Sequence, residues 1–356
     1  MPGLYIGSTS GFAGKNLLAM ALGSKFQQQG YRVGYMKPVG TLPRDMENKM
    51  GDEDAFFVQD ALGLSQDLEL VTPVLVTEEL REQAFTEGCP GLLDKITSAY
   101  TTLSNEVDIM LICGSGSFLH AGKYCNVAGL DVAKSLQTKV LLIDRFIKEV
   151  YYDYILSAKE LLGPNMIGAL FNCVPENKMP EIRYMIAPML KRWDIPLLGA
   201  IPEDYLLNAI RVGDLAQRLG GKIISVPGKQ DAIVENFLIG TMQVENFMTH
   251  FRKRKNSAVL VGGDRSDLQL VALEGKCPCL ILTGNLYPND IILSRSEVLG
   301  VPLIVVRDDT YTVAKKMETI LESSKLRDTV KISHGTELVN SILDYKTIST
   351  ALGIDD

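Results

Sequence analysis

Short apolar runs alternate with longer segments of helical periodicity along the whole chain. Short runs bounded by turn residues are typical of buried strands, whereas apolar residues spaced three and four apart predict amphipathic helices. Strands and helices that alternate in this way predict parallel sheets with helices on both faces, so we expect an α/β fold. The expected strands are residues 4–6, 32–36, 109–113, 140–143, 166–171, 197–201, 258–261, 279–282 and 303–306, and the expected helices include residues 16–29, 54–62, 151–162, 179–193, 266–273 and 309–322.

The alternation is interrupted near residues 220–229. Gly220 and Gly221 close a helix there, and Pro227 and Gly228 mark a turn before a fresh alternation begins. A chain of 356 residues is long enough for about two domains. We therefore expect one domain at residues 1–222 and a smaller α/β domain at residues 230–348.

A run of small residues joins the first expected strand to the first expected helix. Small residues let the backbone curl so that its N–H groups turn inward, and a helix N-terminus adds positive potential. The run therefore predicts a phosphate-binding loop in which Lys15 brings a positive charge to the outer phosphates, and a glycine turn made only for packing is the alternative. The candidate nucleotide-binding residues are Thr9, Ser10, Gly11, Ala13, Gly14, Lys15 and Asn16.

This loop departs from the usual pattern of a P-loop. The pattern has glycine five residues before Gly14, where this chain has Thr9, and serine or threonine after the lysine, where it has Asn16. The hydroxyl that is missing at Asn16 normally contacts Mg²⁺. Cys113 ends a buried strand where nucleoside triphosphatases commonly have a carboxylate, and sulfur suits a hard cation poorly. We expect phosphate binding with a weakened magnesium site.

Two further charged positions are expected at the same edge of the sheet. Lys37 follows the strand at residues 32–36, so in a parallel sheet it emerges beside the loop, where it suits an anionic nucleotide or a carboxylate being phosphorylated. An exposed lysine at a strand end is the alternative. Acidic residues at 52–54 open a helix and are usually caps, while Asp54 is the candidate Mg²⁺ ligand. Lys15 and Lys37 are the candidate catalytic residues.

Five segments resemble, in order, the landmarks of dethiobiotin synthetase: residues 7–16, Lys37-Pro38-Val39, residues 52–55, the strand leading to Gly114, and residues 171–175. The resemblance covers about residues 1–220. It is closer to the dethiobiotin-synthetase-like region at the N-terminus of long phosphotransacetylases, through the run at residues 30–39. This resemblance implies a P-loop domain that binds ATP with Mg²⁺, a homodimer, and an adenine contact at Asn172.

Three later segments resemble the DRTGG domain, which follows the first region in those phosphotransacetylases. They are Gly263-Asp264-Arg265-Ser266-Asp267, Leu282-Thr283-Gly284-Asn285 and Asp308-Asp309-Thr310-Tyr311. Each follows an expected strand, so the three loops open together at the carboxyl edge of a parallel sheet. Arg265 suits a carboxylate or phosphate, although helix capping by the aspartates and a structural Arg265 are the alternative. The candidate second ligand site is Asp264, Arg265, Thr283, Gly284, Asp309 and Thr310.

Composition and charge exclude several classes of protein. Acidic residues number 43 and basic residues 36, for a net charge of −7, which argues against nucleic acid as a partner. No segment approaches the ~20 continuous apolar residues of a membrane span, and the N-terminus lacks the basic and apolar regions of a signal peptide. The cysteines are scattered singly apart from Cys277 and Cys279, so we expect a cytoplasmic protein with reduced thiols.

The sequence leaves more than one function open. Long phosphotransacetylases would continue beyond residue 356 into their acetyl-transferring domain, so acetyl transfer is not predicted. The favoured function is a regulatory or sensor protein that binds a nucleotide or small metabolite and acts on a protein partner or within its own homo-oligomer. The alternative is an ATP-dependent enzyme that activates a carboxylate, as dethiobiotin synthetase and the cobyrinate amidases do. A structural subunit without a small-molecule ligand is the third.

Overall fold

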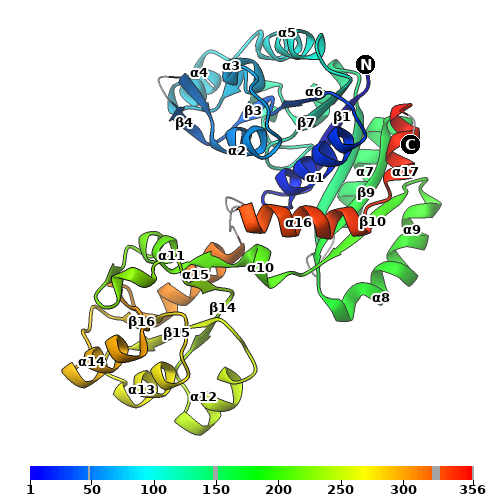
Figure 1. Ribbon diagram of the computed structural model, residues 1–356. Helices are drawn as coiled ribbons and strands as arrows, with labels where there is room; N and C mark the ends of the chain where they lie inside the picture. The colour runs from blue at the N-terminus through cyan, green and yellow to red at the C-terminus, as the bar shows by residue number, and fades with distance from the viewer. Residues whose placement is uncertain (47–48, 147–150, 323–328, 355–356) are drawn as a thin grey trace. The chain divides into compact units, whose positions relative to one another are not determined.

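The protein consists of two compact units (Figure 1). The computed structural model describes residues 1–46, 49–146, 151–322 and 329–354. The first unit comprises Met1–Glu203 and Leu326–Asp356, and the second comprises Asp204–Lys325. Within the described ranges, no helix has the length and apolar character needed to cross a membrane.

The first unit is built on a six-stranded sheet in which all neighbouring strands run parallel. The strand order is β10-β9-β8-β1-β7-β2, so β1 lies between β8 and β7, with Ile6 paired to Leu141 on one side and to Cys113 on the other. The carboxyl ends of these strands share one edge, where ligands bind in such sheets. The strands are β1 (Gly3–Ser8), β2 (Val33–Met36), β7 (Ile109–Cys113), β8 (Lys139–Arg145), β9 (Met166–Val174) and β10 (Leu197–Pro202).

Helices and short strands join the strands of this sheet. The expected helix at residues 179–193 is a helical run interrupted by a π-helical turn at Ile182–Ile186. A hairpin of β4 (Pro43–Met46) and β5 (Lys49–Asp52) leads into α2 (Glu53–Ala61), and β3 (Val39–Gly40) pairs with β6 (Val74–Leu75). The other helices before residue 203 are α1 (Lys15–Gln28), α3 (Leu68–Val71), α4 (Glu78–Thr86), α5 (Leu92–Ser104), α6 (Gly129–Ser135), α7 (Tyr151–Leu162), α8 (Met179–Glu181) and α9 (Ala187–Arg192).

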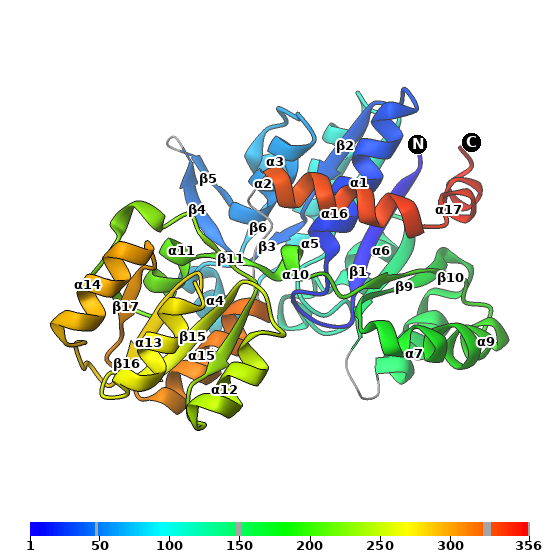
Figure 2. The ribbon, with the colours of Figure 1, turned by 60° about the horizontal axis from the view of Figure 1, so that its bottom comes forward.

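The C-terminal helices return to the first unit. α16 (Thr329–Ile342) lies against α1 and β10, as Figures 1 and 2 show, and α17 (Tyr345–Leu352) follows it. Val339 and Ile348 are buried, and the Asp344 N–H donates to the Leu198 carbonyl at 2.8 Å. The second unit is therefore inserted between β10 and α16.

The division of the chain differs from the expected boundaries at residues 222, 230 and 348. Residues 204–222 belong to the second unit, because Val212 and Leu215 of α11 (Val212–Arg218) are buried in its core. The helices after residue 328 belong to the first unit, because their apolar faces are buried there.

The second unit contains a five-stranded sheet in the order β12-β17-β16-β15-β14. Its strands are parallel except for β12, which runs antiparallel to β17. Along β15, Ala258 and Leu260 belong to one apolar core and Val259 and Val261 to the other, so the sheet is covered on both faces. The strands are β12 (Lys222–Ile223), β14 (Asn236–Ile239), β15 (Ser257–Gly262), β16 (Leu280–Thr283) and β17 (Leu303–Val305), and the longer helices are α12 (Val244–Phe251), α13 (Ser266–Glu274), α14 (Asp290–Leu299) and α15 (Thr310–Glu322).

Candidate functional site

The glycine loop joins the central strand β1 to α1. Gly14 stands at the N-cap of α1 with a φ of 105°, a conformation that glycine adopts without a steric penalty. Phe12 has a φ of 54°, whereas Gly11 is not among the residues with positive φ. No side chain in the described part of the chain caps α1, so the first N–H groups of the helix are left for water or an anion.

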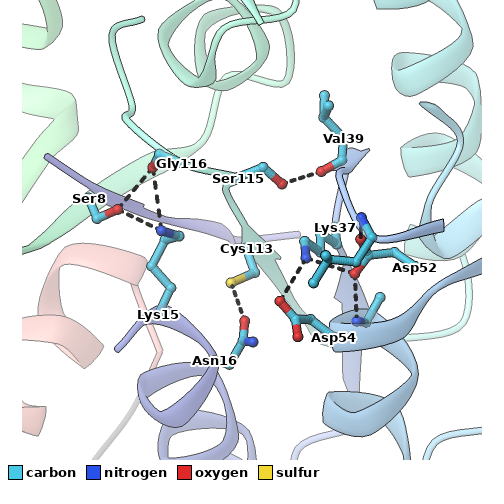
Figure 3. Close-up of polar contacts among 12 residues, drawn as sticks. Ser8, Lys15, Asn16, Lys37, Val39, Asp52, Asp54, Cys113, Ser115 and Gly116 are labelled. Carbon is cyan, nitrogen blue, oxygen red and sulfur yellow. Dashed lines mark hydrogen bonds and ion pairs between the residues drawn. The ribbon is translucent and has the colours of Figure 1, made fainter. Parts of the chain in front are cut away.

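Lys15 is folded back against the end of β1 (Figure 3). Its Nζ donates to Ser8 Oγ at 2.6 Å and to the carbonyl oxygens of Ser10 and Gly116, each at 3.4 Å. The side chain is buried, and this burial lowers the pKa of the ammonium to about 8, helped by the positive charge of Lys37. All three of these acceptors are neutral oxygens, and none of the described residues forms an ion pair with Lys15.

Lys37 forms a buried ion-pair cluster with two carboxylates. Its Nζ lies 2.7 Å from Asp52 Oδ1 and 3.3 Å from Asp54 Oδ2. Asp52 also accepts from the N–H groups of Leu42 and Ala55, each at 3.0 Å, and is the N-cap of α2. Burial opposes the charge on Lys37, but Asp52 and Asp54 outweigh it and raise the pKa above its usual value. Lys37 is thus not an exposed strand-end lysine, and of the two aspartates it is Asp52 that caps α2.

Cys113 and Asn16 contact each other between these two lysines (Figure 3). Cys113 Sγ donates to Asn16 Oδ1 at 3.5 Å. The thiol is completely buried, and burial raises its pKa even though Lys15 and Lys37 favour the thiolate. The cysteine is therefore held as a neutral thiol, which is a poor nucleophile and a poor ligand for a hard cation.

The residues at this edge do not fit Mg²⁺. The position after the P-loop lysine supplies the amide of Asn16 in place of a hydroxyl, and the end of β7 supplies the thiol of Cys113. Asp54, the candidate Mg²⁺ ligand, lies against Lys37. Among the residues that the structure describes, no group of three or more His, Cys, Asp or Glu side chains could hold a metal ion.

Asn172, on β9, supports the backbone of the glycine loop. Its Nδ2 donates to the carbonyl oxygen of Ala13 at 2.9 Å, and its Oδ1 accepts from the Cys173 N–H at 2.9 Å. The side chain is buried, and a Cβ at Gly14 would lie 2.3 Å from its Nδ2. The amide is thus engaged by the backbone at both ends, and the adenine contact implied by the resemblance stays a prediction.

Asp144 is a functional candidate that the sequence analysis missed. It lies near the end of β8, next to β1, and accepts a hydrogen bond from the hydroxyl of Thr9. Burial raises its pKa to about 6. The signal was available, because Asp144 directly follows the apolar run at residues 140–143, in the same way that Lys37 follows its strand.

We expect an Asp144→Asn variant to gain stability relative to the parent as the pH rises from about 4 to about 6.5, when the two free energies of unfolding are compared at each pH. The raised pKa means that the folded state disfavours the charged carboxylate, so this residue costs stability as the pH rises through that window. The difference between about 6 and the ordinary 3.8 sets an upper limit of about 3 kcal/mol above that window. Urea titrations across this range measure it, with Asp60→Asn on α2 as a control for the loss of one charge. A variant that is less stable than the parent at pH 7 would contradict the expectation.

The three loops of the second candidate site meet at the carboxyl edge of the second sheet. The hydroxyls of Thr283 and Thr310 lie 2.8 Å apart, and the Gly284 N–H donates to the Asp308 carbonyl at 2.9 Å. Asp309 Oδ1 accepts from backbone N–H groups in the first turn of α15, at 2.9 and 3.1 Å, and therefore caps that helix.

Arg265 and Asp264 were also expected at this second site, and Arg265 already forms an ion pair with a neighbouring residue. Arg265 pairs with Asp267, with Nη2 at 3.0 Å from Oδ2, so its guanidinium is bound within its own turn. Asp264 lies in the turn after β15, and a Cβ on Gly262 would meet its Oδ1. The structure thus brings Thr283, Gly284 and Thr310 together, and a ligand there stays a prediction.

Comparisons with known proteins support this architecture. Residues 2–211 match the family model AAA_26, described as an AAA domain, and residues 214–320 match the model of the DRTGG domain. The phosphate acetyltransferase of Synechocystis sp. is 23% identical over 358 residues, which cover 96% of this chain and 50% of that protein. The chain spans about half the length of the phosphate acetyltransferases that it matches.

Two further comparisons each cover somewhat more than half of the chain. The ATP-dependent dethiobiotin synthetase of Methanocaldococcus jannaschii is 27% identical over 218 residues, which cover 58% of this chain and 97% of that protein. Cobyrinic acid a,c-diamide synthase from Mycobacterium smegmatis, solved with bound ADP and magnesium, is 16% identical with a TM-score of 0.35, covering 57% of this chain and 87% of that one. The resemblance to dethiobiotin synthetases and to the N-terminal part of phosphate acetyltransferases is confirmed.

Proposed function

The chain belongs to the AAA_26 family of AAA domains, and from that premise we propose that its first unit binds a nucleotide or a related phosphate-bearing metabolite in a regulatory role. The buried ammonium of Lys15 carries this proposal. It stands at the start of an uncapped helix and contacts only neutral oxygens among the described residues. A buried charge without a counterion is costly. An anion at the mouth of the loop would supply that counterion and meet the N–H groups of α1 as well.

The position of Lys37 favours the regulatory role over carboxylate activation. In the enzyme alternative this lysine would meet the carboxylate of a substrate. Here Asp52 lies 2.7 Å from its ammonium and is itself fixed by two backbone N–H groups. A substrate carboxylate would have to displace the Asp52 carboxylate from Lys37. We therefore infer that Lys37 stabilises the structure of the site and does not bind a substrate.

The path of the chain supports a sensor. The second unit is inserted between β10 and α16, and α16 lies against α1, the helix that begins with Lys15. A ligand that shifts the start of α1 would therefore act on an element to which the second unit is covalently joined. In this proposal the loops around Thr283 and Thr310 form a separate ligand site in the second unit.

The resemblance also implies a homo-oligomer. Sedimentation velocity on the full chain tests this expectation.

We expect Lys15→Met to weaken ATP and ADP binding by about 10- to 100-fold, because a hydrogen bond to a charged group contributes about 1.5–3 kcal/mol. Isothermal titration calorimetry on the full chain measures the affinities. Lys191→Met, at an exposed position on α9, is the matched control and should bind as the parent does. Absence of nucleotide binding by the parent would contradict the proposal. ATP turnover above about 1 s⁻¹, the low end for ordinary enzymes, would contradict the regulatory role and favour the ligase alternative.

A further inference from the structure

Asn16 and Cys113 occupy the two positions from which P-loop proteins hold Mg²⁺. Asn16 follows the P-loop lysine, where a hydroxyl normally contacts the metal. Cys113 ends β7, the strand beside β1, where a carboxylate normally completes the metal site. In this chain the two side chains contact each other instead, at 3.5 Å (Figure 3).

The contact pairs the thiol with the amide oxygen without a cation. The thiol of Cys113 donates its proton toward the amide oxygen of Asn16, so the oxygen that faces the site is already an acceptor in use. Mg²⁺ requires near-octahedral oxygen ligands at about 2.0–2.1 Å. A thiol sulfur is not such a ligand, and the amide oxygen of Asn16 already uses one of its two lone pairs for the thiol proton.

The Asp54 carboxylate near this pair is also engaged. Asp54 Oδ2 lies 3.3 Å from Lys37 Nζ, and its side chain is 22% exposed. The Lys37 ammonium offsets the negative charge that Asp54 would otherwise present to a phosphate, which is part of what a bound cation does in other P-loop sites. Lys15 then remains as a positive charge that forms no ion pair with a described carboxylate.

We propose that the first unit binds its phosphate-bearing ligand as the metal-free anion, with Lys15 and the N-terminus of α1 holding the phosphates and Lys37 neutralising Asp54. This inference rests on the proposed function, because it assigns the ionic form of the same ligand. Mg²⁺ would mask phosphate charge without gaining ligands from the protein. Binding should therefore be as tight without Mg²⁺ as with it, or tighter.

Calorimetric titration of the full chain with ADP, in Mg²⁺ and in EDTA, tests the inference. We expect the two dissociation constants to agree within about twofold, or the EDTA value to be lower. A dissociation constant at least about tenfold higher in EDTA would overturn the inference and leave the proposed function standing. If ADP and ATP fail to bind under either condition, the proposal that the first unit binds a nucleotide fails, and this inference fails with it.

A variant that restores oxygen ligands gives the converse test. Asn16→Thr with Cys113→Glu places a hydroxyl and a carboxylate at the two positions, and we expect ADP binding to become at least about tenfold tighter in Mg²⁺ than in EDTA. If a folded double variant binds ADP equally well in Mg²⁺ and in EDTA, the result counts against the inference.

Since Cys113 is buried, its replacement can disturb folding, and a second measurement therefore uses the unaltered chain. Mn²⁺ replaces Mg²⁺ as a spin probe, and the electron paramagnetic resonance signal of free Mn²⁺ is measured in a mixture of ADP and Mn²⁺ before and after the protein is added. We expect that adding the protein does not lower this signal. A protein-dependent loss of that signal would overturn the inference.

Discussion

Replacing Asp52 with alanine is expected to lower the stability of the first unit by about 3–5 kcal/mol, the cost of removing one partner from a buried ion pair. Lys37, 4% exposed at its side chain, would lose the carboxylate at 2.7 Å and keep only Asp54 at 3.3 Å. The N–H groups of Leu42 and Ala55 would lose their acceptor as well. Urea unfolding followed by fluorescence measures this, because Trp193 is the only tryptophan of the chain and lies in the first unit.

Two further variants separate charge from helix capping. Asp52→Asn keeps an oxygen for the N–H group of Ala55 but removes the charge, so it should retain the capping contribution of about 1 kcal/mol and lose the ion pair. Lys37→Met combined with Asp52→Asn removes both charges, and we expect it to be more stable than Asp52→Asn alone, because the unpaired buried ammonium is gone. A loss below about 1 kcal/mol for Asp52→Ala would show that the pair is solvated and that Lys37 is available to a substrate.

The strands could be predicted because their information is local. Each long strand of both sheets is an apolar run bounded by turn residues, and all nine expected runs are strands in the structure. β12 (Lys222–Ile223) and β14 (Asn236–Ile239) were missed, since such short edge strands are defined by the neighbour with which they pair. The unit boundary was misplaced for a similar reason. The pattern of α16 and α17 indicates that one face is buried but not which sheet buries it.

The same distinction holds at the candidate site. Lys15, Lys37 and Asp54 could be identified because each is adjacent in sequence to the end of a strand or the start of a helix. The contacts that decide what they do join residues far apart in the chain, such as the Thr9–Asp144 and Asn172–Ala13 hydrogen bonds. The resemblance supplied Asn172 as a site residue but could not show that its amide is bound to the loop backbone.

Gly14→Ala is expected to abolish nucleotide binding by deforming the loop. Alanine at a φ of 105° is strained by about 1–3 kcal/mol, and its Cβ would lie 2.3 Å from Asn172 Nδ2. Gly11→Ala is the matched control, because its Cβ would meet no atom within 4 Å and Gly11 is not among the positive-φ residues. Calorimetry with ADP should therefore distinguish the two variants sharply. Equal affinities for the two would mean that the loop conformation does not govern binding.

Asn172→Ala then decides between two roles for this amide. If it holds the loop through the Ala13 carbonyl, its loss weakens every nucleotide by the same factor, because all of them use the phosphate cradle. If it reads adenine, its loss weakens ATP and leaves GTP unchanged. From the two backbone contacts of the amide we expect the first result, with ATP and GTP weakened about equally and by about tenfold. A selective loss of ATP affinity would assign Asn172 to the base, and the loop would then have to be held by its other contacts, foremost the hydrogen bond between Thr9 and Asp144.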